Sequence, residues 1–335
     1  MPTAAVLSWV KSPGFNTFTP QCLTAFEATL AWLKEWACSR NFGLGTRLPW
    51  DPQFVIESLS DSTIYMAYYT IAHLLQGDME GRTPGTLGLL PEQLTDAVFD
   101  HIFLDGPVPA AAGGEAPVPA ADALAKLRAE FNFWYPLDLR VSGKDLIQNH
   151  LTMSLYNHAA IWGARADRMP QAFFCNGHVQ VDGAKMSKSV GNFIILEEAI
   201  ARWGADATRL ALADAGDGLD DANFERDTAD AAILRLTTEE EWSKEVIADE
   251  EAGRLRTGSL THVDRVFDAK ISRAVVTTAA AYDAMRFRDA LRNGFYALQL
   301  DRDTYRDTCA KLEIVRCPDL LHELPRFALS AHPRE

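Results

Sequence analysis

Apolar residues recur at helical spacing through most of the last third of this 335-residue chain. Intervals of three and four residues mark one face of a helix, so the pattern predicts amphipathic helices that pack into a bundle from about residue 223 onward. If the bundle lacks further helices, we expect Phe267, Phe295 and Leu298 to form an exposed apolar patch. The apolar positions, interpreted as packing residues, are Trp242, Val246, Ile247, Val263, Val266, Phe267, Leu291, Phe295 and Leu298.

The period of the pattern changes within residues 137–159. Leu137 to Val141 alternate apolar and polar residues, as the end of a β-strand does, and Gly143 follows in a turn. Beyond the turn, apolar residues return at helical spacing, at Leu146, Ile147, Leu151, Leu155 and Ala159. The segment therefore predicts a strand, a glycine turn and a helix.

Two turn signals divide the next apolar stretch. Phe173–Cys175 and His178–Val181 predict two short strands, and the Asn176-Gly177 pair between them favours a tight hairpin. A second turn at Asp182-Gly183 leads into residues 185–189, which are rich in lysine and serine. The sequence thus predicts a basic loop that follows directly on a hairpin.

Beyond the basic loop, the pattern is helical again. Asn192 has the side chain of a helix cap, and the helix it would cap runs from about Leu196 to Trp203 and ends at Gly204. A second helix is predicted through Asp206 to Ala215.

Residues up to about 105 are predicted to be mostly helical around Ser58–Leu75. Residues 106–121 are rich in proline, glycine and alanine, which predicts a low-complexity surface loop without chemistry.

The composition is that of a globular protein, with 47% hydrophobic and 23% charged residues. The sequence has no apolar run of about 18 residues and no signal-peptide pattern, so we expect a cytoplasmic protein without a membrane partner. No two cysteines have C-x-x-C spacing, and we expect reduced thiols rather than zinc ligands or disulfides. The cysteines are Cys22, Cys38, Cys175, Cys309 and Cys317.

The net charge of -14 argues against a sequence-independent nucleic-acid coat, because phosphate contacts need concentrated lysine and arginine. It does not exclude an RNA partner that contacts basic residues on one face. Each candidate basic residue could equally lie on a solvated helix face. The candidates are Arg202, Arg209, Arg235, Lys270 and Arg273.

The string Lys185-Met186-Ser187-Lys188-Ser189 places two ammonium groups and two hydroxyls in one turn. Such a turn suits a departing pyrophosphate, because lysine point charges stabilise the charge that develops in nucleotidyl transfer. Alone, the string is also common in solvated loops.

The turn at residues 141–150 is the second candidate. Gly143 would let the backbone approach a ribose or phosphate at the end of a strand, and Asp145 would accept hydrogen bonds from ribose hydroxyls. His150 lies deeper along the helix, where it would reach the other substrate. An ordinary first-turn carboxylate and a satisfied core histidine are the alternative interpretation.

Together the two segments resemble the catalytic half of class I aminoacyl-tRNA synthetases, and the surrounding residues narrow the resemblance to the leucyl-tRNA synthetases of the eukaryotic cytosolic and archaeal type. The similarity extends with few gaps from about Thr24 to Arg306. Besides the basic loop, the segments that carry it are Trp36–Arg40, Gly43–Asp51, Glu57–Met66, Phe133–Arg140, Val141–His150, Arg209–Asp217 and Asp221–Phe224.

The resemblance implies an α/β fold, namely the second half of a Rossmann-type nucleotide-binding domain followed by an α-helical bundle. It implies that leucine is activated by ATP, accompanied by Mg2+, and transferred to tRNA(Leu), with membership of a multi-synthetase complex as a further expectation. No metal ligand is assigned. The residues implied to be catalytic are Lys185, Ser187, Lys188 and Ser189. Those implied to bind the nucleotide are Gly143, Asp145, His178, Val179 and Met186. Those implied to bind the other substrates are Ser39, Arg40, Asn149 and His150.

The sequence also departs from the family. The His-x-Gly-His signature that grips the ATP phosphates does not occur in it. We predict a partial catalytic domain at residues 1–222, the start of a tRNA-binding helical domain at 223–307 and a divergent tail at 308–335. The two ends are interpreted as gene-model or splicing artefacts around an internal piece of a larger enzyme, weakly active or inactive by itself.

Two alternatives stay open at this point. One is a truncated paralogue that binds tRNA, nucleotide or a protein without ligating anything. The other is a different class I synthetase, of the valine or isoleucine type.

Overall fold

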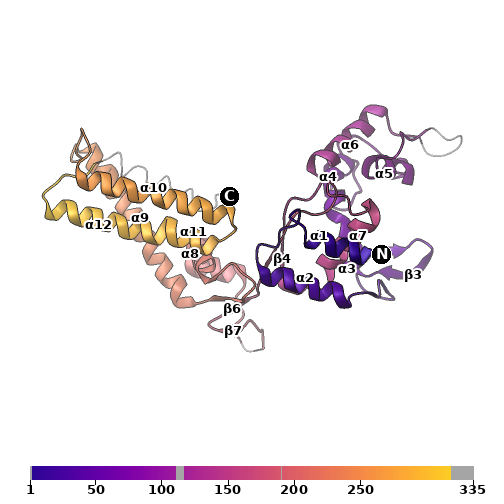
Figure 1. Cartoon of the computed structure of the whole chain (residues 1–335), viewed down its shortest axis with the longest axis horizontal. Helices are drawn as coiled ribbons and strands as arrows, with labels where there is room; N and C mark the ends of the chain where they lie inside the picture. The colour runs from indigo at the N-terminus through magenta and orange to yellow at the C-terminus, as the bar shows by residue number, and fades with distance from the viewer. Residues whose placement is uncertain (1, 111–116, 190, 318–335) are drawn as a thin grey trace. The chain divides into compact units, whose positions relative to one another are not determined.

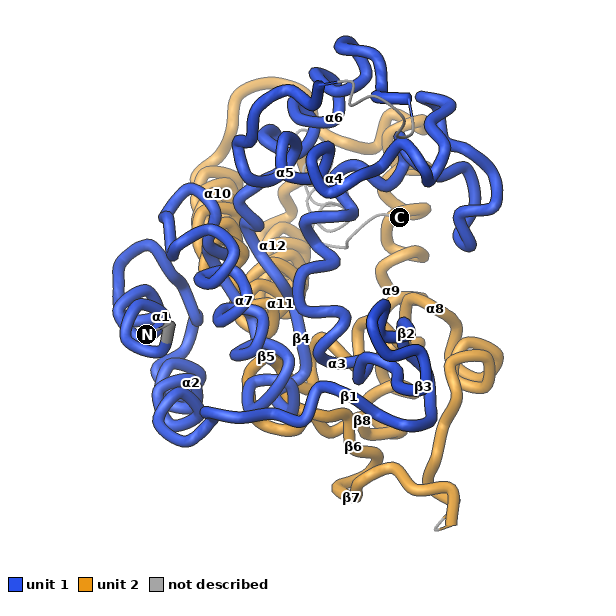
Figure 2. The backbone as a smooth tube through the Cα atoms, turned by 90° about the vertical axis from the view of Figure 1, so that its right-hand side faces the viewer, with its two compact units in different colours: residues 1–175 blue, residues 176–335 orange. Residues whose placement is uncertain are grey.

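The computed structural model describes residues 2–110, 117–189 and 191–317. The chain divides into two compact units, residues 1–175 and 176–335, which Figure 2 distinguishes by colour. Among the described residues, we find no helix whose length and apolar character would allow it to cross a bilayer. The predicted domain division at residue 222 stays a prediction.

The first unit opens with two helices, α1 (Pro2–Val10) and α2 (Pro20–Trp32). Phe15, in the connection between them, makes edge-on contacts with Phe26 and Phe173, with ring centroids 6.0 and 5.3 Å away. Phe173 starts strand β5 (Phe173–Asn176), which pairs with β4 (Arg140–Gly143). The phenylalanine cluster therefore packs α2 against the strand beside the glycine turn.

A small antiparallel sheet follows α2, and the sequence pattern did not predict it. Strand β3 (Asp51–Ile56) lies in the centre, between β1 (Ser39–Arg40) and β2 (Arg47–Leu48). The outer strands have two residues each, which is too short for an alternating pattern to be recognised.

The remaining helices of the first unit surround a second core, which includes Ile71, Ile102, Leu127 and Phe131. The predicted helical region at residues 58–75 is confirmed. The described parts of the predicted loop, residues 106–110 and 117–120, contain no helix or strand, and residues 111–116 lie outside the described ones. The elements are α3 (Ser58–Asp61), the 3-10 turn η1 (Ser62–Ile64), α4 (Tyr65–Leu75), the 3-10 turn η2 (Pro91–Gln93), α5 (Asp96–Phe103) and α6 (Ala121–Trp134).

His158 is buried in the aromatic part of this core. Its Nδ1 lies 2.7 Å from the Ser154 carbonyl oxygen and therefore carries a proton, so that Nε2 accepts a hydrogen bond from the Tyr135 hydroxyl. Burial disfavours the charged ring and lowers the pKa of His158 to about 4. The ring is thus held neutral.

We expect His158 to make the first unit less stable in acid. The unfolded chain binds a proton near pH 6.5, and folded His158 does so only near pH 4, so the free energy of unfolding should fall by roughly 3 kcal/mol across that interval. Urea unfolding at a series of pH values measures the effect. The control is His158→Gln, which should lose this part of the pH dependence; an unchanged dependence would contradict the assignment.

The second unit begins with a three-stranded sheet. Strand β6 (Val179–Val181) pairs antiparallel with β7 (Ala184–Lys185) and parallel with β8 (Ala222–Phe224). The predicted hairpin at Asn176-Gly177 is wrong, because β5 and β6 belong to different sheets. The hairpin joins β6 to β7 through Asp182-Gly183, whose φ angles of 50° and 77° suit a tight two-residue turn.

Gly177 allows its own backbone to pass close to the backbone of residues 218–221, and it does not form a turn. Its N–H donates to the Gly218 carbonyl oxygen at 2.9 Å. A Cβ atom on Gly177 would lie 2.1 Å from the carbonyl oxygen of Asp220 and 2.8 Å from the nitrogen of Asp221. A side chain here would separate the chain before β6 from the chain before β8.

We therefore expect Gly177→Ala to lower the free energy of unfolding of the second unit by about 1–3 kcal/mol, as overpacking does. The matched control is Gly218→Ala, because a Cβ at Gly218 meets no atom within 4 Å. Calorimetric unfolding of both variants makes the comparison. Equal losses would show that glycine flexibility, rather than the close approach, decides the effect.

Helix α8 (Leu196–Ala215) is bent at Gly204, whose φ of 80° and ψ of 164° are not helical. The predicted pair of helices separated at Gly204 is confirmed. The rest of the second unit is a bundle of helices, seen in Figure 1. They are α9 (Arg226–Glu251), α10 (His262–Asp283), α11 (Phe287–Leu291), the π-helical turn η5 (Arg292–Tyr296) and α12 (Ala297–Lys311).

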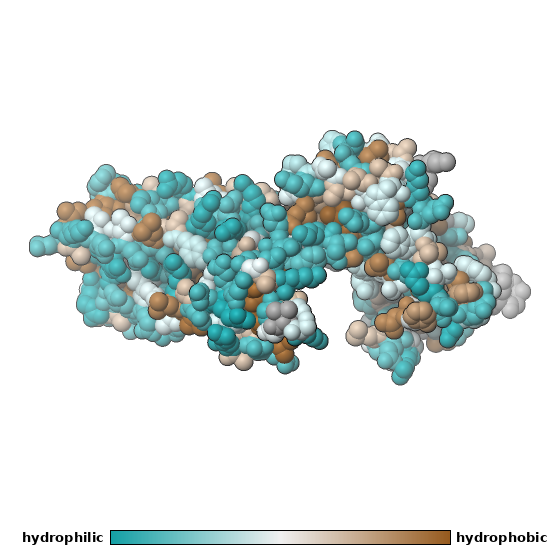
Figure 3. Space-filling model, turned by 90° about the horizontal axis from the view of Figure 1, so that it is seen from below, coloured by the Kyte–Doolittle hydropathy of each residue, from teal (hydrophilic) through white to brown (hydrophobic). Residues whose placement is uncertain are grey.

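The bundle buries most of the predicted packing residues. Trp242, Val246, Phe267, Phe295 and Leu298 are buried. The expected exposed patch is wrong, because Phe267, Phe295 and Leu298 are only 2%, 8% and 3% exposed. Ile247 and Val266 are exposed instead, at 52% and 44%. Hydrophilic residues dominate the face drawn in Figure 3. Of the predicted tail, residues 318–335 lie outside the described ones.

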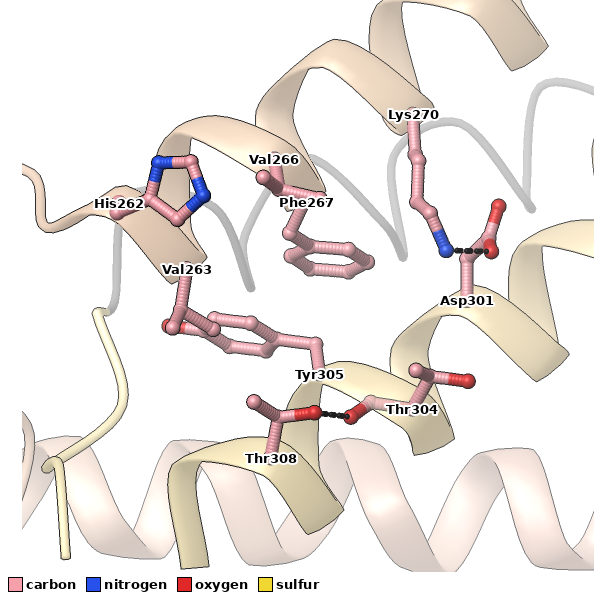
Figure 4. A pocket seen from close by; sticks show the side chains of 9 residues that line it. All are labelled: His262, Val263, Val266, Phe267, Lys270, Asp301, Thr304, Tyr305 and Thr308. Carbon is pink, nitrogen blue, oxygen red and sulfur yellow. Dashed lines mark hydrogen bonds and ion pairs between the residues drawn. The ribbon is translucent and has the colours of Figure 1, made fainter. Parts of the chain in front are cut away.

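A groove of about 190 Å³ lies between α10 and α12 (Figure 4). The rings of Phe267 and Tyr305 stack in it with centroids 4.5 Å apart. Lys270 Nζ lies 2.6 Å from an Asp301 carboxylate oxygen at its side. The charge of Lys270, one of the candidate RNA-contacting residues, is therefore neutralised within the bundle.

Two more of the candidate basic residues pack on aromatic rings. The guanidinium of Arg202 lies 4.5 Å from the ring centroid of Trp203, and that of Arg235 lies 4.9 Å from the centroid of Tyr296. These contacts favour the interpretation of both arginines as packing residues on helix surfaces.

Candidate functional site

The first candidate segment has the predicted order of strand, turn and helix. Strand β4 ends at Gly143, followed by the 3-10 turn η3 (Lys144–Leu146), the π-helical turn η4 (Ile147–Leu151) and α7 (Thr152–Trp162). A Cβ on Gly143 would lie 2.5 Å from Asp145 Oδ1, so the carboxylate occupies the space that glycine leaves. Asp145 is exposed, which lets its carboxylate accept hydrogen bonds from a ligand.

His150 points into the first unit and is 2% exposed. Its Nε2 lies 2.9 Å from Ser62 Oγ, and that hydroxyl donates its one proton to the Ser58 carbonyl oxygen at 2.8 Å. Ser62 therefore accepts from His150, which places the imidazole proton on Nε2. His150 Nδ1 is buried and has no hydrogen-bond partner among the described residues. It offers a lone pair to a donor on a ligand.

Burial and a neighbouring positive charge favour the neutral form of His150. Burial, and then the positive charge of Arg140, lower the pKa of His150. The Arg140 guanidinium lies 5.4 Å from the ring centroid of Tyr65, and that ring lies 6.1 Å from the imidazole. Asn149 Oδ1 accepts a hydrogen bond of 2.6 Å from the backbone N–H of His150. Asn149 thus braces the turn that carries His150.

Ser39 and Arg40 lie on β1 of the antiparallel sheet. The Arg40 guanidinium donates to the carbonyl oxygens of Ala37 and Ser39 at 2.7 and 3.1 Å and lies 3.9 Å from Glu57. Glu57 caps α3, accepting from the Ser60 backbone and hydroxyl at 3.0 and 2.9 Å. Burial raises the pKa of Glu57, and these hydrogen bonds outweigh it and hold the pKa low. The segment supports the turn that bears Ser62.

The second candidate segment, the lysine loop at residues 185–189, is braced by Asn192. Asn192 Oδ1 accepts from the backbone N–H of Ser187 at 2.9 Å, and its Nδ2 donates to the Lys185 carbonyl oxygen at 3.0 Å. The predicted helix cap is therefore wrong: the N-cap of α8 is Ile195, and the carboxamide of Asn192 closes the loop instead.

The loop presents its positive charges to solvent. Lys185 and Lys188 are exposed, and within the described ranges neither ammonium group has a carboxylate partner. Lys188 Nζ lies 5.4 Å from the ring centroid of Phe193, and the hydroxyls of Ser187 and Ser189 are 2.8 Å apart. Although the chain as a whole has a net charge of -14, this turn is locally positive and can therefore bind a polyphosphate.

His178 and Val179 lie just before and within β6, and Met186 is half-buried in the loop. The His178 backbone N–H donates to Asp221 Oδ1 at 2.8 Å. Gly183 donates to Asn223 Oδ1 at 2.6 Å. Residues before and within β8 therefore hold the start of β6 and the turn between β6 and β7, which leads into the lysine loop. Among the described residues, no group of three or more His, Cys, Asp or Glu side chains is arranged to hold a metal ion.

Sequence patterns did not identify Ser62, Tyr65 and Arg140 as neighbours of His150, or Asn192 as the residue that braces the lysine loop. Ser62 and Tyr65 are three residues apart and share one helical face, which was the available signal. Nothing in the spacing links them to His150, because that contact spans 88 positions.

Comparison with known proteins finds similarity to one family in a region that contains both candidate segments. A model described as tRNA synthetases class I (M) matches residues 124–235, which contain Gly143, His150 and the lysine loop. A putative cytoplasmic leucine–tRNA ligase of Schizosaccharomyces pombe is 50% identical over 90% of this chain, and the cytoplasmic enzyme of Arabidopsis thaliana is 51% identical over 88%. The chain is homologous to leucine–tRNA ligases.

The resemblance of the sequence to leucyl-tRNA synthetases is thereby confirmed. The chain spans about a quarter of these ligases, 26% of each. The class I synthetase fold is confirmed as well. A methionyl-tRNA synthetase of Mycobacterium tuberculosis, solved with methionyl-adenylate, superposes with a TM-score of 0.62 at 19% identity, covering 91% of this chain and 51% of that one.

Proposed function

We propose that this chain forms part of a cytoplasmic leucine–tRNA ligase, which activates leucine with ATP and transfers it to tRNA(Leu). The observation that carries the proposal is the 50% identity to a leucine–tRNA ligase across 90% of the chain. The two segments with suitable chemistry, the turn at residues 143–150 and the lysine loop, both lie within the part matched by the synthetase family model.

In the proposed reaction, the leucine carboxylate attacks the α-phosphorus of ATP, leucyl-adenylate forms and pyrophosphate leaves. Lys185 and Lys188 stabilise the charge that develops on the leaving group, with the Ser187 and Ser189 hydroxyls as donors. The exposure of both ammonium groups supports this role. Mg2+ enters with ATP as part of the substrate, because phosphate oxygens bind hard cations. No nucleophile from the protein is required.

The remaining residues bind and orient the substrates in this proposal. Gly143 and Asp145 hold the ribose, and the backbone at His178 and Val179, with Met186 nearby, meets the adenine. His150, braced by Asn149, lines the site for leucine and the adenylate, where its unpartnered Nδ1 accepts from a donor on the ligand. That Ser39 and Arg40 bind the other substrates stays a prediction, and the contacts of Arg40 with Ala37 and Glu57 also support the turn with Ser62. Membership of a multi-synthetase complex stays a prediction.

A binding protein without ligase activity is the alternative that the experiment has to distinguish from the proposed ligase. Exchange of labelled pyrophosphate into ATP distinguishes the ligase from the binding protein. The assay uses the polypeptide purified through a tag from its source cells, and the intact mass of that polypeptide is recorded. We expect exchange that depends on leucine and exceeds that with valine or isoleucine. Exchange with valine or isoleucine alone would indicate another synthetase, and no exchange with any of them would favour the binding protein.

A further inference from the structure

Ser62, the first residue of η1, lies between the backbone of α3 and the imidazole of His150. Its hydroxyl oxygen lies 2.8 and 3.3 Å from the carbonyl oxygens of Ser58 and Leu59, and 2.9 Å from His150 Nε2. Carbonyl oxygens only accept hydrogen bonds, so the single hydroxyl proton points to the backbone and the lone pairs of the hydroxyl oxygen face the ring. The ring therefore donates from Nε2 to Ser62.

The opposite edge of the imidazole gives an independent reason for the same tautomer. His150 Nδ1 is buried without a hydrogen-bond partner among the described residues, and the residue is 2% exposed. A proton on Nδ1 would be a buried donor without an acceptor, and such donors are rarer in folded proteins than acceptors without a donor. Since buried polar atoms are almost always paired, the lone pair at Nδ1 also indicates that a ligand supplies the missing donor.

The segments that carry Ser62 and His150 are held together beside this contact. The residue after Ser62, Thr63, is 1% exposed; its carbonyl oxygen accepts from the Ser154 hydroxyl at 2.8 Å, and its own hydroxyl accepts from the Asn157 carboxamide at 2.6 Å. Ser154 and Asn157 lie on α7, which continues the turn that carries His150. The packing of η1 on α7 therefore sets the distance between Ser62 and the ring.

We propose that Ser62 is a positioning residue for substrate binding. By accepting from Nε2, it holds the His150 ring in one orientation and one tautomer, so that a lone pair at Nδ1 selects a hydrogen-bond donor of the substrate and disfavours an acceptor. The substrate part of this inference rests on the ligase function proposed above. Leucine has such a donor in its ammonium group and ATP in its ribose hydroxyls, whereas the leucine carboxylate and the ATP phosphates only accept.

Nitrogen NMR of the full chain, labelled with ¹⁵N in the histidine rings and free of substrate, measures the tautomer directly. Two-bond proton–nitrogen correlations distinguish a protonated from an unprotonated ring nitrogen, and the His150→Gln variant identifies the His150 signals among the eight histidines. We expect Nε2 to be protonated, with its proton protected from exchange with water, and Nδ1 to be unprotonated. A proton on Nδ1 in the unsubstituted chain would overturn the proposal.

Variants of Ser62 test whether its hydroxyl positions the ring. Ser62→Ala should abolish the protection of the Nε2 proton, and Ser62→Thr, which keeps the hydroxyl, should restore it. The matched control is Ser58→Ala, which removes an exposed hydroxyl one turn earlier but keeps the carbonyl oxygen that accepts from Ser62. An Nε2 proton equally protected in Ser62→Ala would show that the hydroxyl does not hold the ring.

The same variants, compared in leucine-dependent pyrophosphate exchange, test the substrate part. Because the proposed role is in binding, Ser62→Ala should raise one KM about tenfold, as expected for the loss of one hydrogen bond, and leave kcat within about twofold. Both supporting outcomes are informative: a higher KM for leucine assigns the ammonium group to Nδ1, and a higher KM for ATP assigns a ribose hydroxyl.

Two failures remain distinguishable. If exchange is intact and neither KM changes in Ser62→Ala, the role of Ser62 in substrate binding is wrong. If the unsubstituted protein shows the expected tautomer but no exchange with any amino acid, the proposed ligase function is wrong, and the NMR result still supports the positioning of His150 by Ser62.

Discussion

Lys188→Ala should reduce the turnover number of leucine-dependent pyrophosphate exchange by about 10²- to 10³-fold, the usual cost of losing one charge-stabilising group. The ammonium group is exposed, has no carboxylate partner within the described ranges and rests against the Phe193 ring. Since it would act on the departing pyrophosphate, the loss should appear in kcat, with little change in the KM for leucine. Lys185→Ala should behave in the same way.

The matched control for both variants is Lys244→Ala. Lys244 is also exposed, but it forms ion pairs of 2.8 and 3.1 Å with Glu240 and Glu241 on α9. Its removal should leave the rate of pyrophosphate exchange within about twofold of the rate of the unsubstituted protein, as expected for a surface ion pair. A similar small loss in Lys185→Ala and Lys188→Ala would mean that the lysine loop is a solvated turn without a catalytic role.

Asp264→Asn should lower the free energy of unfolding of the bundle by about 3–5 kcal/mol, because it breaks a buried ion pair from one side. Asp264 is 0% exposed and accepts from the Arg256 guanidinium, from the Thr261 backbone and hydroxyl at 2.6 Å each, and from the Tyr305 hydroxyl at 2.7 Å. The Tyr305 hydroxyl in turn accepts from the Cys317 backbone at 3.0 Å. One carboxylate therefore joins the start of α10, α12 and the chain beyond it.

Hydrogen exchange of the α10 amides in the variant measures this loss locally, which matters in a chain with two units. Asp268→Asn, an exposed position on the same helix, is the control and should change exchange little. Equal protection in the two variants would show that the network adds no stability.

The same carboxylate should also make the bundle sensitive to acid. Burial raises the pKa of Asp264, but the hydrogen bonds from Thr261, Tyr305 and Arg256 outweigh burial and hold the pKa below 3.8. Its contribution is therefore present above that pH and lost as the pH falls through the lower folded pKa.

Local patterns predicted the parts of the fold that local interactions determine. The strand, turn and helix at residues 140–162, the break at Gly204 and most packing positions of the bundle follow from periodicity and from glycine conformation. The Asn176-Gly177 hairpin failed because the same dipeptide suits a tight turn and a close backbone contact, and only the contact with Asp220 distinguishes them. The prediction that Asn192 caps α8 failed for a similar reason, since a side chain suited to capping a helix can also close a loop.

The candidate site was only partly accessible from the sequence. The lysine loop and the Gly143 turn are each a continuous stretch of sequence, so the residue types that suggest their chemistry can be recognised from the sequence alone. The surroundings of His150 are not, because Ser62 and Tyr65 meet it only through folding over long separations. Whether a histidine is a satisfied core residue or offers a free ring nitrogen depends on such contacts.

Photolabelling with an azido-adenine analogue of ATP tests the central claim most directly, because it asks which residues of the protein meet the nucleotide. We expect the label on the peptide that contains His178, Val179 and the lysine loop, and we expect ATP or a non-hydrolysable leucyl-adenylate analogue to prevent it. Label confined to the bundle after residue 223, or label that neither competitor reduces, would contradict the assignment of a synthetase active site to this chain.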